Sequence, residues 1–158
     1  MHEINVSIEI EAPIEKVFEA LSDHESFLAG PGMSCALTKE GQPNRNGLGA
    51  LRQIEAGNKK FTEQITAFET PNHYEYVIQS LTTKSGRKIP FQHERGWLDF
   101  SVKNGKTVVE WTTRFRINIP LIGGFISRRV GSNLIQAFND MLQTAKNQLE
   151  ETQRAVNT

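Results

Sequence analysis

The sequence predicts an α+β fold in which a seven-stranded antiparallel sheet curves around one long C-terminal helix. Three observations predict it. The chain starts with a strictly alternating apolar segment, continues through two short helical segments into six strand-like segments, and ends in an apolar stripe of helical period. One helix cannot cover a flat sheet of this width. We therefore expect the sheet to curl around the helix and to leave an internal space between them.

The first element is a strand with one polar face. Apolar side chains occupy every second position: Ile4, Val6, Ile8 and Ile10. A period of two with polar residues between is typical of a half-buried antiparallel strand. Pro13 then opens a short helix, because a first helical turn tolerates the missing N–H of proline. A second short helix carries Phe27 and Leu28, and the turn signal Gly30-Pro31-Gly32 ends it.

Six further strands are predicted, because turn signals rich in Gly, Asn and Pro separate successive apolar runs. Asn104-Gly105 is a strong signal, since this dipeptide favours a two-residue hairpin turn. The expected strands cover residues 33–40, 49–56, 60–69, 73–83, 91–103 and 106–119.

The apolar period changes after Pro120, and a helix is predicted from Gly124 to Glu150. Such a helix would be about 40 Å long at 1.5 Å per residue. We expect residues 1–150 to form a single ligand-binding domain and the polar residues 151–158 to be a frayed tail.

Composition and charge narrow the classes of function. The chain has 158 residues with 18 basic and 18 acidic side chains, so it lacks the surplus of cations on which general nucleic-acid binding depends. The single cysteine, Cys35, excludes an internal disulfide and a zinc site with several cysteines. The histidines have no metal-ligand spacing, and we expect no metal and no cofactor. No apolar run reaches the roughly 20 residues that span a bilayer. Without a secretory signal pattern, we expect a cytoplasmic monomer or homodimer with no stable membrane insertion.

Three ionisable side chains fall on strand faces that are otherwise apolar: Arg52, Glu63 and Glu94. Because an unpaired buried charge is costly, each should be paired, have a shifted pKa or face solvent in a cavity. In one interpretation, Arg52 and Glu63 form a structural ion pair across neighbouring strands. In another, they line a pocket and orient a polar group of a ligand. In a third, a glutamate is the general acid or base of an enzyme, with Glu63 and Glu94 as the catalytic candidates.

Inward-facing aromatic and aliphatic residues complete the expected ligand site. The aromatic residues are more numerous than one amphipathic helix can bury, which favours a partly open apolar cavity. With Arg52, Glu63 and Glu94, the expected lining residues are Tyr74, Tyr76, Leu98, Phe100, Trp111 and Phe115 from the strands and Leu134, Phe138 and Met141 from the helix.

Four stretches together follow the pattern of a known protein family: SIEIEAPIEKVFEALSD, GLGALRQIEAGNKKFTEQITAFETPNHYEYVI, RGWLDFSVKNGKTVVEWTTRFR and the terminal helix. In these stretches the chain resembles the START/Bet v 1-like (SRPBCC) superfamily, specifically its polyketide cyclase/dehydrase and lipid-transport branch. The resemblance implies a helix-grip fold, with a cavity for a hydrophobic ligand between the sheet and the C-terminal helix. Arg52 and Glu63 match an arginine and a glutamate that are frequent in the family.

Three functional hypotheses follow. The leading one is a protein that binds a small lipid-, polyketide- or quinone-like molecule in the cavity. The alternative is a cyclase or dehydratase in which Glu63 or Glu94 moves a proton and Arg52 stabilises an enolate. A further alternative is a protein-interaction module, which would present a large apolar patch on the outside of the sheet. Glu110, Arg114 and Arg116 on the expected outer face argue against such a patch.

Overall fold

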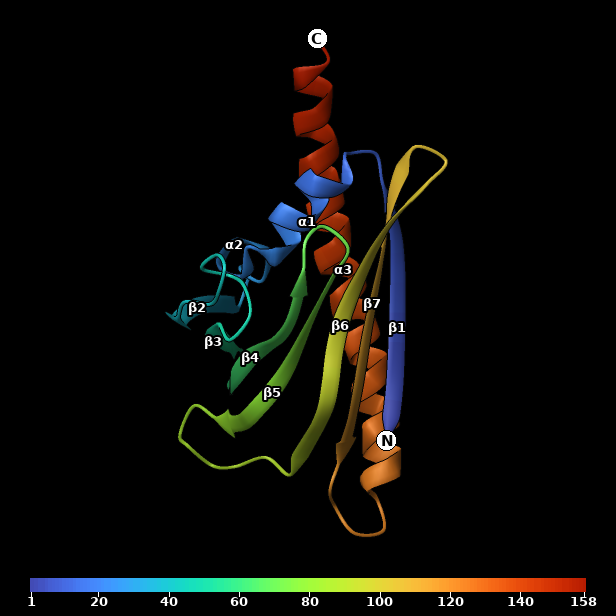
Figure 1. The fold of residues 1–158 in the computed structure, drawn as a ribbon. Coiled ribbons are helices and arrows are strands. Elements are labelled where there is room, and N and C mark those ends of the chain that lie inside the picture. Colours follow the sequence, from blue (N-terminus) through green and yellow to red (C-terminus); the bar gives the residue numbers. More distant parts are fainter.

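The computed structural model describes every residue from Met1 to Thr158. Its elements are β1 (His2–Ile10), α1 (Ile14–Ser22), α2 (His24–Phe27), β2 (Met33–Lys39), β3 (Leu51–Ala56), β4 (Lys59–Glu69), β5 (His73–Thr83), β6 (Phe91–Lys103), β7 (Lys106–Ile117) and α3 (Gly123–Val156). This order confirms the predicted succession of a strand, two short helices, six strands and a long helix (Figure 1).

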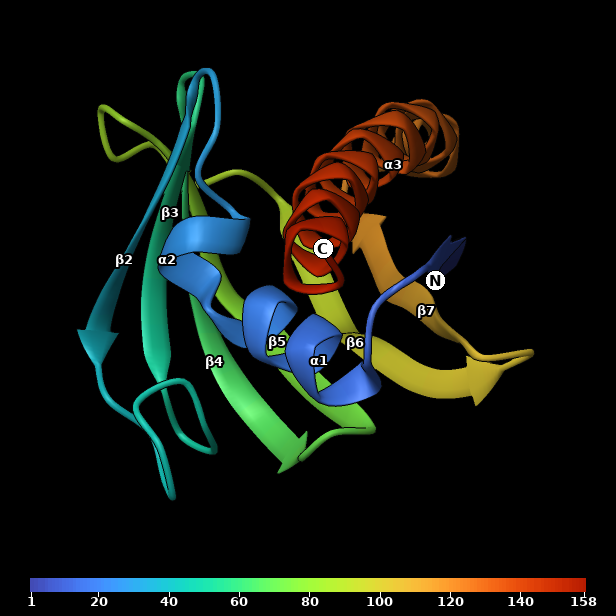
Figure 2. The ribbon, with the colours of Figure 1, turned by 90° about the horizontal axis from the view of Figure 1, so that it is seen from above.

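The seven strands form one antiparallel sheet in the order β1-β7-β6-β5-β4-β3-β2. The sheet is curved, and all three helices lie on its concave side (Figure 2). α3 packs against β1 and β7 at one edge, whereas α1 contacts β6 and β7, and α2 contacts β2. The predicted curvature of the sheet around the C-terminal helix is therefore confirmed.

β-Bulges contribute to this curvature, because an extra residue bends a strand and increases its twist. Register shifts interrupt β2 between Leu37 and Lys39 and β6 between His93 and Arg95, and the pairing of β4 with β5 has two more. Pairing between β5 and β6 is restricted to four residues on each strand, His73–Tyr76 with Gly96–Asp99. Beyond Tyr76 the two strands separate, and the sheet loses its regular ladder there.

The concave face is largely filled by α1. The ring of Phe18 packs edge-on against three aromatic rings of the sheet, with centroid separations of 5.2 Å to Phe68, 6.0 Å to Tyr74 and 5.0 Å to Phe100. Phe18, Tyr74 and Phe100 are all buried. The space expected between sheet and helix is therefore a packed aromatic core over this part of the sheet.

The long helix α3 has 34 residues and continues to Val156. The prediction that the helix ends at Glu150 is therefore wrong. The sequence from Glu151 to Ala155 contains mostly good helix formers. Glu150 also holds this part of α3 against the segment that follows β1. Its carboxylate accepts hydrogen bonds from Lys146 Nζ at 2.6 Å and from the backbone N–H of Glu11 at 2.9 Å. None of the helices combines the length and apolar character required to cross a membrane.

Candidate functional site

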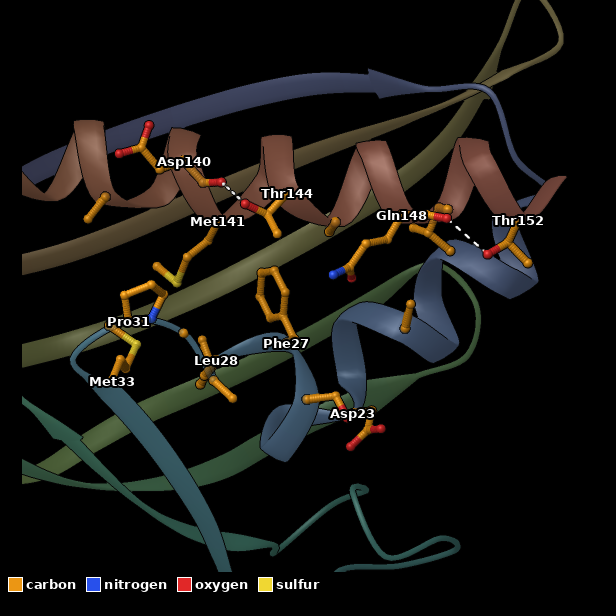
Figure 3. Close-up of a pocket in the computed structure, with 17 residues that line it drawn as sticks. Asp23, Phe27, Leu28, Pro31, Met33, Asp140, Met141, Thr144, Gln148 and Thr152 are labelled. Carbon is orange, nitrogen blue, oxygen red and sulfur yellow. Dashed lines mark hydrogen bonds between the residues drawn. The ribbon is translucent and has the colours of Figure 1, made fainter. Parts of the chain in front are cut away.

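A groove of about 570 Å³ lies between α2, the turn that follows it and the C-terminal half of α3 (Figure 3). One wall carries Phe27, Leu28, Pro31 and Met33, and Met141 extends toward them from α3. Its volume falls within the range of about 300–1,000 Å³ that is usual for small-molecule sites. We call this space the groove.

The local sequence explains the shape of the wall opposite α3. The helix α2 is only four residues long, and the chain then turns sharply into β2. Gly32 has a φ of 74°, which residues with a side chain rarely adopt. The turn presents Phe27 and Leu28 toward α3, where Leu28 is buried and Phe27 is half-buried. The apolar wall is therefore a consequence of a short helix followed by a glycine turn.

The groove also contains polar groups, since nine of its 17 lining residues are hydrophobic and the others are not. The hydroxyls of Thr144 and Thr152 donate to carbonyls of their own helix, each at 2.9 Å. Gln148 extends from α3 into the space between α3 and α1 (Figure 3). A mixed lining of this kind fits an amphipathic molecule better than a pure hydrocarbon.

Behind α2 lies a buried ion pair between neighbouring strands. Arg52 of β3 and Glu63 of β4 are direct cross-strand partners. Glu63 Oε2 accepts from Arg52 Nε at 2.6 Å and lies 2.5 Å from Arg52 Nη2. Both residues are buried. Burial alone would lower the pKa of Arg52, but the Glu63 carboxylate raises it above its ordinary value. The ion pair considered in the sequence analysis is therefore present, and neither residue lines the groove.

Two buried groups near this pair have unused hydrogen-bonding capacity. Arg52 Nη1 and both ring nitrogens of His24 lack a partner. His24 belongs to α2, the same short helix as the groove residue Phe27. The centroid of its ring lies 5.5 Å from that of the Tyr74 ring. Burial holds the pKa of His24 well below its ordinary value, and the positive charge of Arg52 adds to this effect. The imidazole is therefore neutral, and it can both donate and accept a hydrogen bond.

A hydrogen-bonded network occupies the interior where β5 and β6 separate. Trp111 Nε1 donates to the Tyr76 hydroxyl at 2.9 Å. The backbone N–H of Ile78 donates to His93 Nδ1 at 2.9 Å, so Nε2 carries the proton and donates to Thr113 Oγ1 at 2.7 Å. Burial lowers the pKa of His93 from 6.5 to about 4. The neutral ring of His93 thus replaces the acceptor that a regular ladder would supply to Ile78.

Glu94 lies outside this interior, which corrects the expectation that it faces the cavity. Its side chain is exposed and pairs with Arg114 at 3.3 Å. The cause is the bulge between His93 and Arg95, because one extra residue exchanges the two faces of a strand. His93 therefore points inward in place of Glu94. The inward position of His93 was not predicted, although its spacing of two from the apolar Phe91 indicates it.

Most of the other expected lining residues form the core instead of the groove. Met141 alone among the predicted ligand-binding residues lines it. Phe138 stacks face to face on Trp111, with centroids 3.7 Å apart and planes 4° from parallel. Leu134 packs against the core, half-buried. The residues buried in the core are Tyr74, Tyr76, Leu98, Phe100, Trp111, Phe115 and Phe138. Side-chain packing that closes a space in this way cannot be seen in an alternation pattern.

The chain has the START/Bet v 1-like helix-grip fold, and comparisons with solved structures show the same fold. A START superfamily protein from Mycobacterium smegmatis superimposes with a TM-score of 0.70 at 13% identity, covering 96% of this chain and 99% of that chain. The protein TTHA0849 from Thermus thermophilus gives 0.73 at 16% identity, with coverage of 96% and 99%. Ara h 8.0201 gives 0.71 at 14% identity, with coverage of 94% and 97%. At these identities the likeness concerns the fold alone.

The family is established by the sequence itself. The chain belongs to the family described as polyketide cyclase / dehydrase and lipid transport, whose model matches residues 1–150. This match confirms the resemblance found in the four sequence stretches. A comparison with curated proteins finds no significant match.

Proposed function

We propose that the protein binds a small hydrophobic molecule, lipid-, polyketide- or quinone-like, in the groove between α2 and α3. The observation that carries the proposal is a groove of about 570 Å³ with an apolar wall of Phe27, Leu28 and Met33 facing Met141. It occurs in a family whose description includes lipid transport. The polar lining residue Gln148 would orient the polar end of the ligand.

Phe27 separates the groove from the aromatic interior. Its ring centroid lies 5.6 Å from that of Trp111, which stacks in turn on Phe138. A change in the Phe27 rotamer would extend the groove toward Trp111 and Tyr76. A longer ligand would then approach the unused hydrogen-bonding groups of His24 and Arg52. In this proposal the packed interior between sheet and helix becomes accessible from the groove only when Phe27 moves.

Binding is better supported than a cyclase or dehydratase reaction. Neither catalytic candidate lines the groove, because Glu63 is held by Arg52 and Glu94 lies on the outer face with Arg114. Charged side chains also cover the outer face of the sheet, where Arg95 lies over the Trp97 ring at 4.3 Å. The outside of the sheet is therefore less suited than the groove to an apolar partner.

Titration with the fluorescent fatty acid cis-parinaric acid tests this proposal. Ala137 lines the groove, so Ala137→Trp would fill part of it. Gln143→Trp places the same side chain on an exposed position of the same helix and is the matched control. We expect wild type and Gln143→Trp to bind alike and Ala137→Trp to bind at least about tenfold more weakly, a difference of about 1.4 kcal/mol. Equal affinity of all three proteins, or no binding by wild type, would contradict the proposal.

A further inference from the structure

Exposed apolar side chains gather at the end of the molecule where β7 turns into α3. Leu121 is fully exposed at 105%, Phe125 at 68% and Ile122 at 52%. Figure 1 shows this turn, coloured orange, at the lower end of the protein, opposite the C-terminus of α3. Large apolar side chains scattered singly on a surface are ordinary, but three in one turn mark a surface with a partner.

The turn is held by buried hydrogen bonds at its base. Ser127 Oγ donates to the carbonyl of Gly123 at 2.7 Å and accepts from the backbone N–H of Ile117 at 2.9 Å. A Cβ on Gly123 would lie 2.3 Å from the Ile117 carbonyl oxygen, so this close approach requires glycine. Leu121 itself has a φ of 68°, an unfavourable conformation for a leucine. The fold therefore keeps Leu121 in a backbone conformation that leucine disfavours, and it exposes an apolar side chain to water.

Two cations of α3 lie next to these apolar side chains. Arg128 and Arg129 follow Phe125 by three and four residues and so share its face of α3. We call the apolar turn with these two cations the apolar-basic end.

Neither Arg128 nor Arg129 takes part in an ion pair, and the first acidic residue of α3 is Asp140. The whole chain has zero net charge, and this excess of positive charge is therefore local.

We propose that the apolar-basic end docks the protein onto the surface of an anionic lipid bilayer. Leu121, Ile122 and Phe125 would enter the boundary between headgroups and acyl chains, while Arg128 and Arg129 bind lipid phosphates. A stable protein interface needs about 800 Å² from each partner, more than three side chains provide. A bilayer needs only a few inserted apolar side chains and nearby basic residues. This docking is peripheral and does not depend on ligand binding in the groove.

Cosedimentation of the intact protein with lipid vesicles tests the proposal. Vesicles of phosphatidylcholine alone are compared with vesicles that also contain phosphatidylglycerol, at low and high salt. We expect wild type to sediment with the anionic vesicles only, and to be released by salt because the attraction is electrostatic in part. The double variants Leu121→Ser/Phe125→Ser and Arg128→Gln/Arg129→Gln should each lower the partition coefficient at least about tenfold.

Matched controls come from the opposite end of the protein. Val102→Ser removes an apolar side chain that is 62% exposed near the β6–β7 hairpin, and Lys103→Gln/Arg154→Gln removes two cations far from the turn. Both controls should bind vesicles as wild type does. The proposal is overturned if wild type stays in the supernatant, if neutral vesicles bind equally, or if the controls lose as much binding as the test variants. A wild-type dimer that Leu121→Ser/Phe125→Ser converts to monomer in sedimentation velocity would assign the surface to a second copy instead.

Discussion

The groove and the aromatic interior are neighbours, separated by Phe27, and they differ in how tightly their side chains pack. The interior is closed, with Trp111 stacked on Phe138 and Arg52 bonded to Glu63. The groove is open, and its residues Phe27, Leu28 and Met141 are buried to different degrees. We therefore expect the interior to contribute mainly to stability, and we propose the groove as the place where a ligand binds. Substitutions in the two regions should therefore separate the two properties.

The largest effect is expected at the buried ion pair. Glu63→Ala leaves the Arg52 guanidinium buried without a counter-charge, which should lower the free energy of unfolding by about 3–5 kcal/mol. Urea denaturation measures this change in the free energy of unfolding. Glu55→Ala, whose partner Lys84 is exposed at 52%, should cost less than about 1 kcal/mol. Similar losses for both variants would contradict a special role of the interior pair.

Phe138→Ala tests the stacked contact that closes the interior. Removing the ring should lower the free energy of unfolding by about 3 kcal/mol and leave a cavity beside Trp111. If the groove and the interior are joined there, the variant should also bind longer fatty acids than wild type does. Denaturation and chain-length titration together measure both effects. An unchanged chain-length preference would show that the two regions stay separate.

A smaller loss of stability is expected at low pH, where His93 of the interior network becomes protonated. The folded-state pKa of His93 is about 4 against an ordinary value of 6.5, so between these values the unfolded chain binds a proton that the folded protein does not. The stability from the neutral ring is complete above pH 6.5 and is lost as the pH falls toward 4. This loss of stability should reach about 2 kcal/mol at about pH 5 in wild type. His93→Gln should lose less stability over the same range, and an identical pH dependence would contradict the assignment.

Gly96→Ala should cost about 1–2 kcal/mol, because a Cβ at Gly96 would lie 2.2 Å from Tyr76 Cζ. Gly124→Ala meets no atom within 4 Å and lies in a helix, so it should be neutral or slightly stabilising. Thermal denaturation of the two variants measures the difference. Equal melting temperatures would mean that the contact between Gly96 and the Tyr76 ring is looser in solution.

The smallest effect on stability is expected in the groove. Met141→Ala should lower the free energy of unfolding by about 1 kcal/mol and weaken fatty-acid binding, since Met141 is half-buried and lines the groove. The adjacent Leu142 is fully buried, and Leu142→Ala should cost about 2–5 kcal/mol. A larger stability loss for Met141→Ala than for Leu142→Ala would contradict the view that the interior contributes more to stability than the groove does.

The sequence predicts the fold well because alternation and helical period are local signals. The Arg52–Glu63 pair follows from them too, since the short turn at Gly57-Asn58 fixes the register of β3 against β4. Glu94 was misplaced because a bulge exchanges strand faces without changing composition. The position of the groove was not predicted. Phe18 of α1 and Phe138 of α3 fill the interior where the cavity was expected, and such packing is not encoded in a local pattern.

The most direct test of ligand binding in the groove uses the three methionines of the chain. Met33 and Met141 line opposite walls of the groove, whereas Met1 is exposed elsewhere. NMR of methyl-labelled methionine during titration with a fatty acid reports on all three positions at once. The account predicts that the Met33 and Met141 signals shift together while the Met1 signal stays in place. Saturating ligand with no shift at Met33 and Met141 would contradict it.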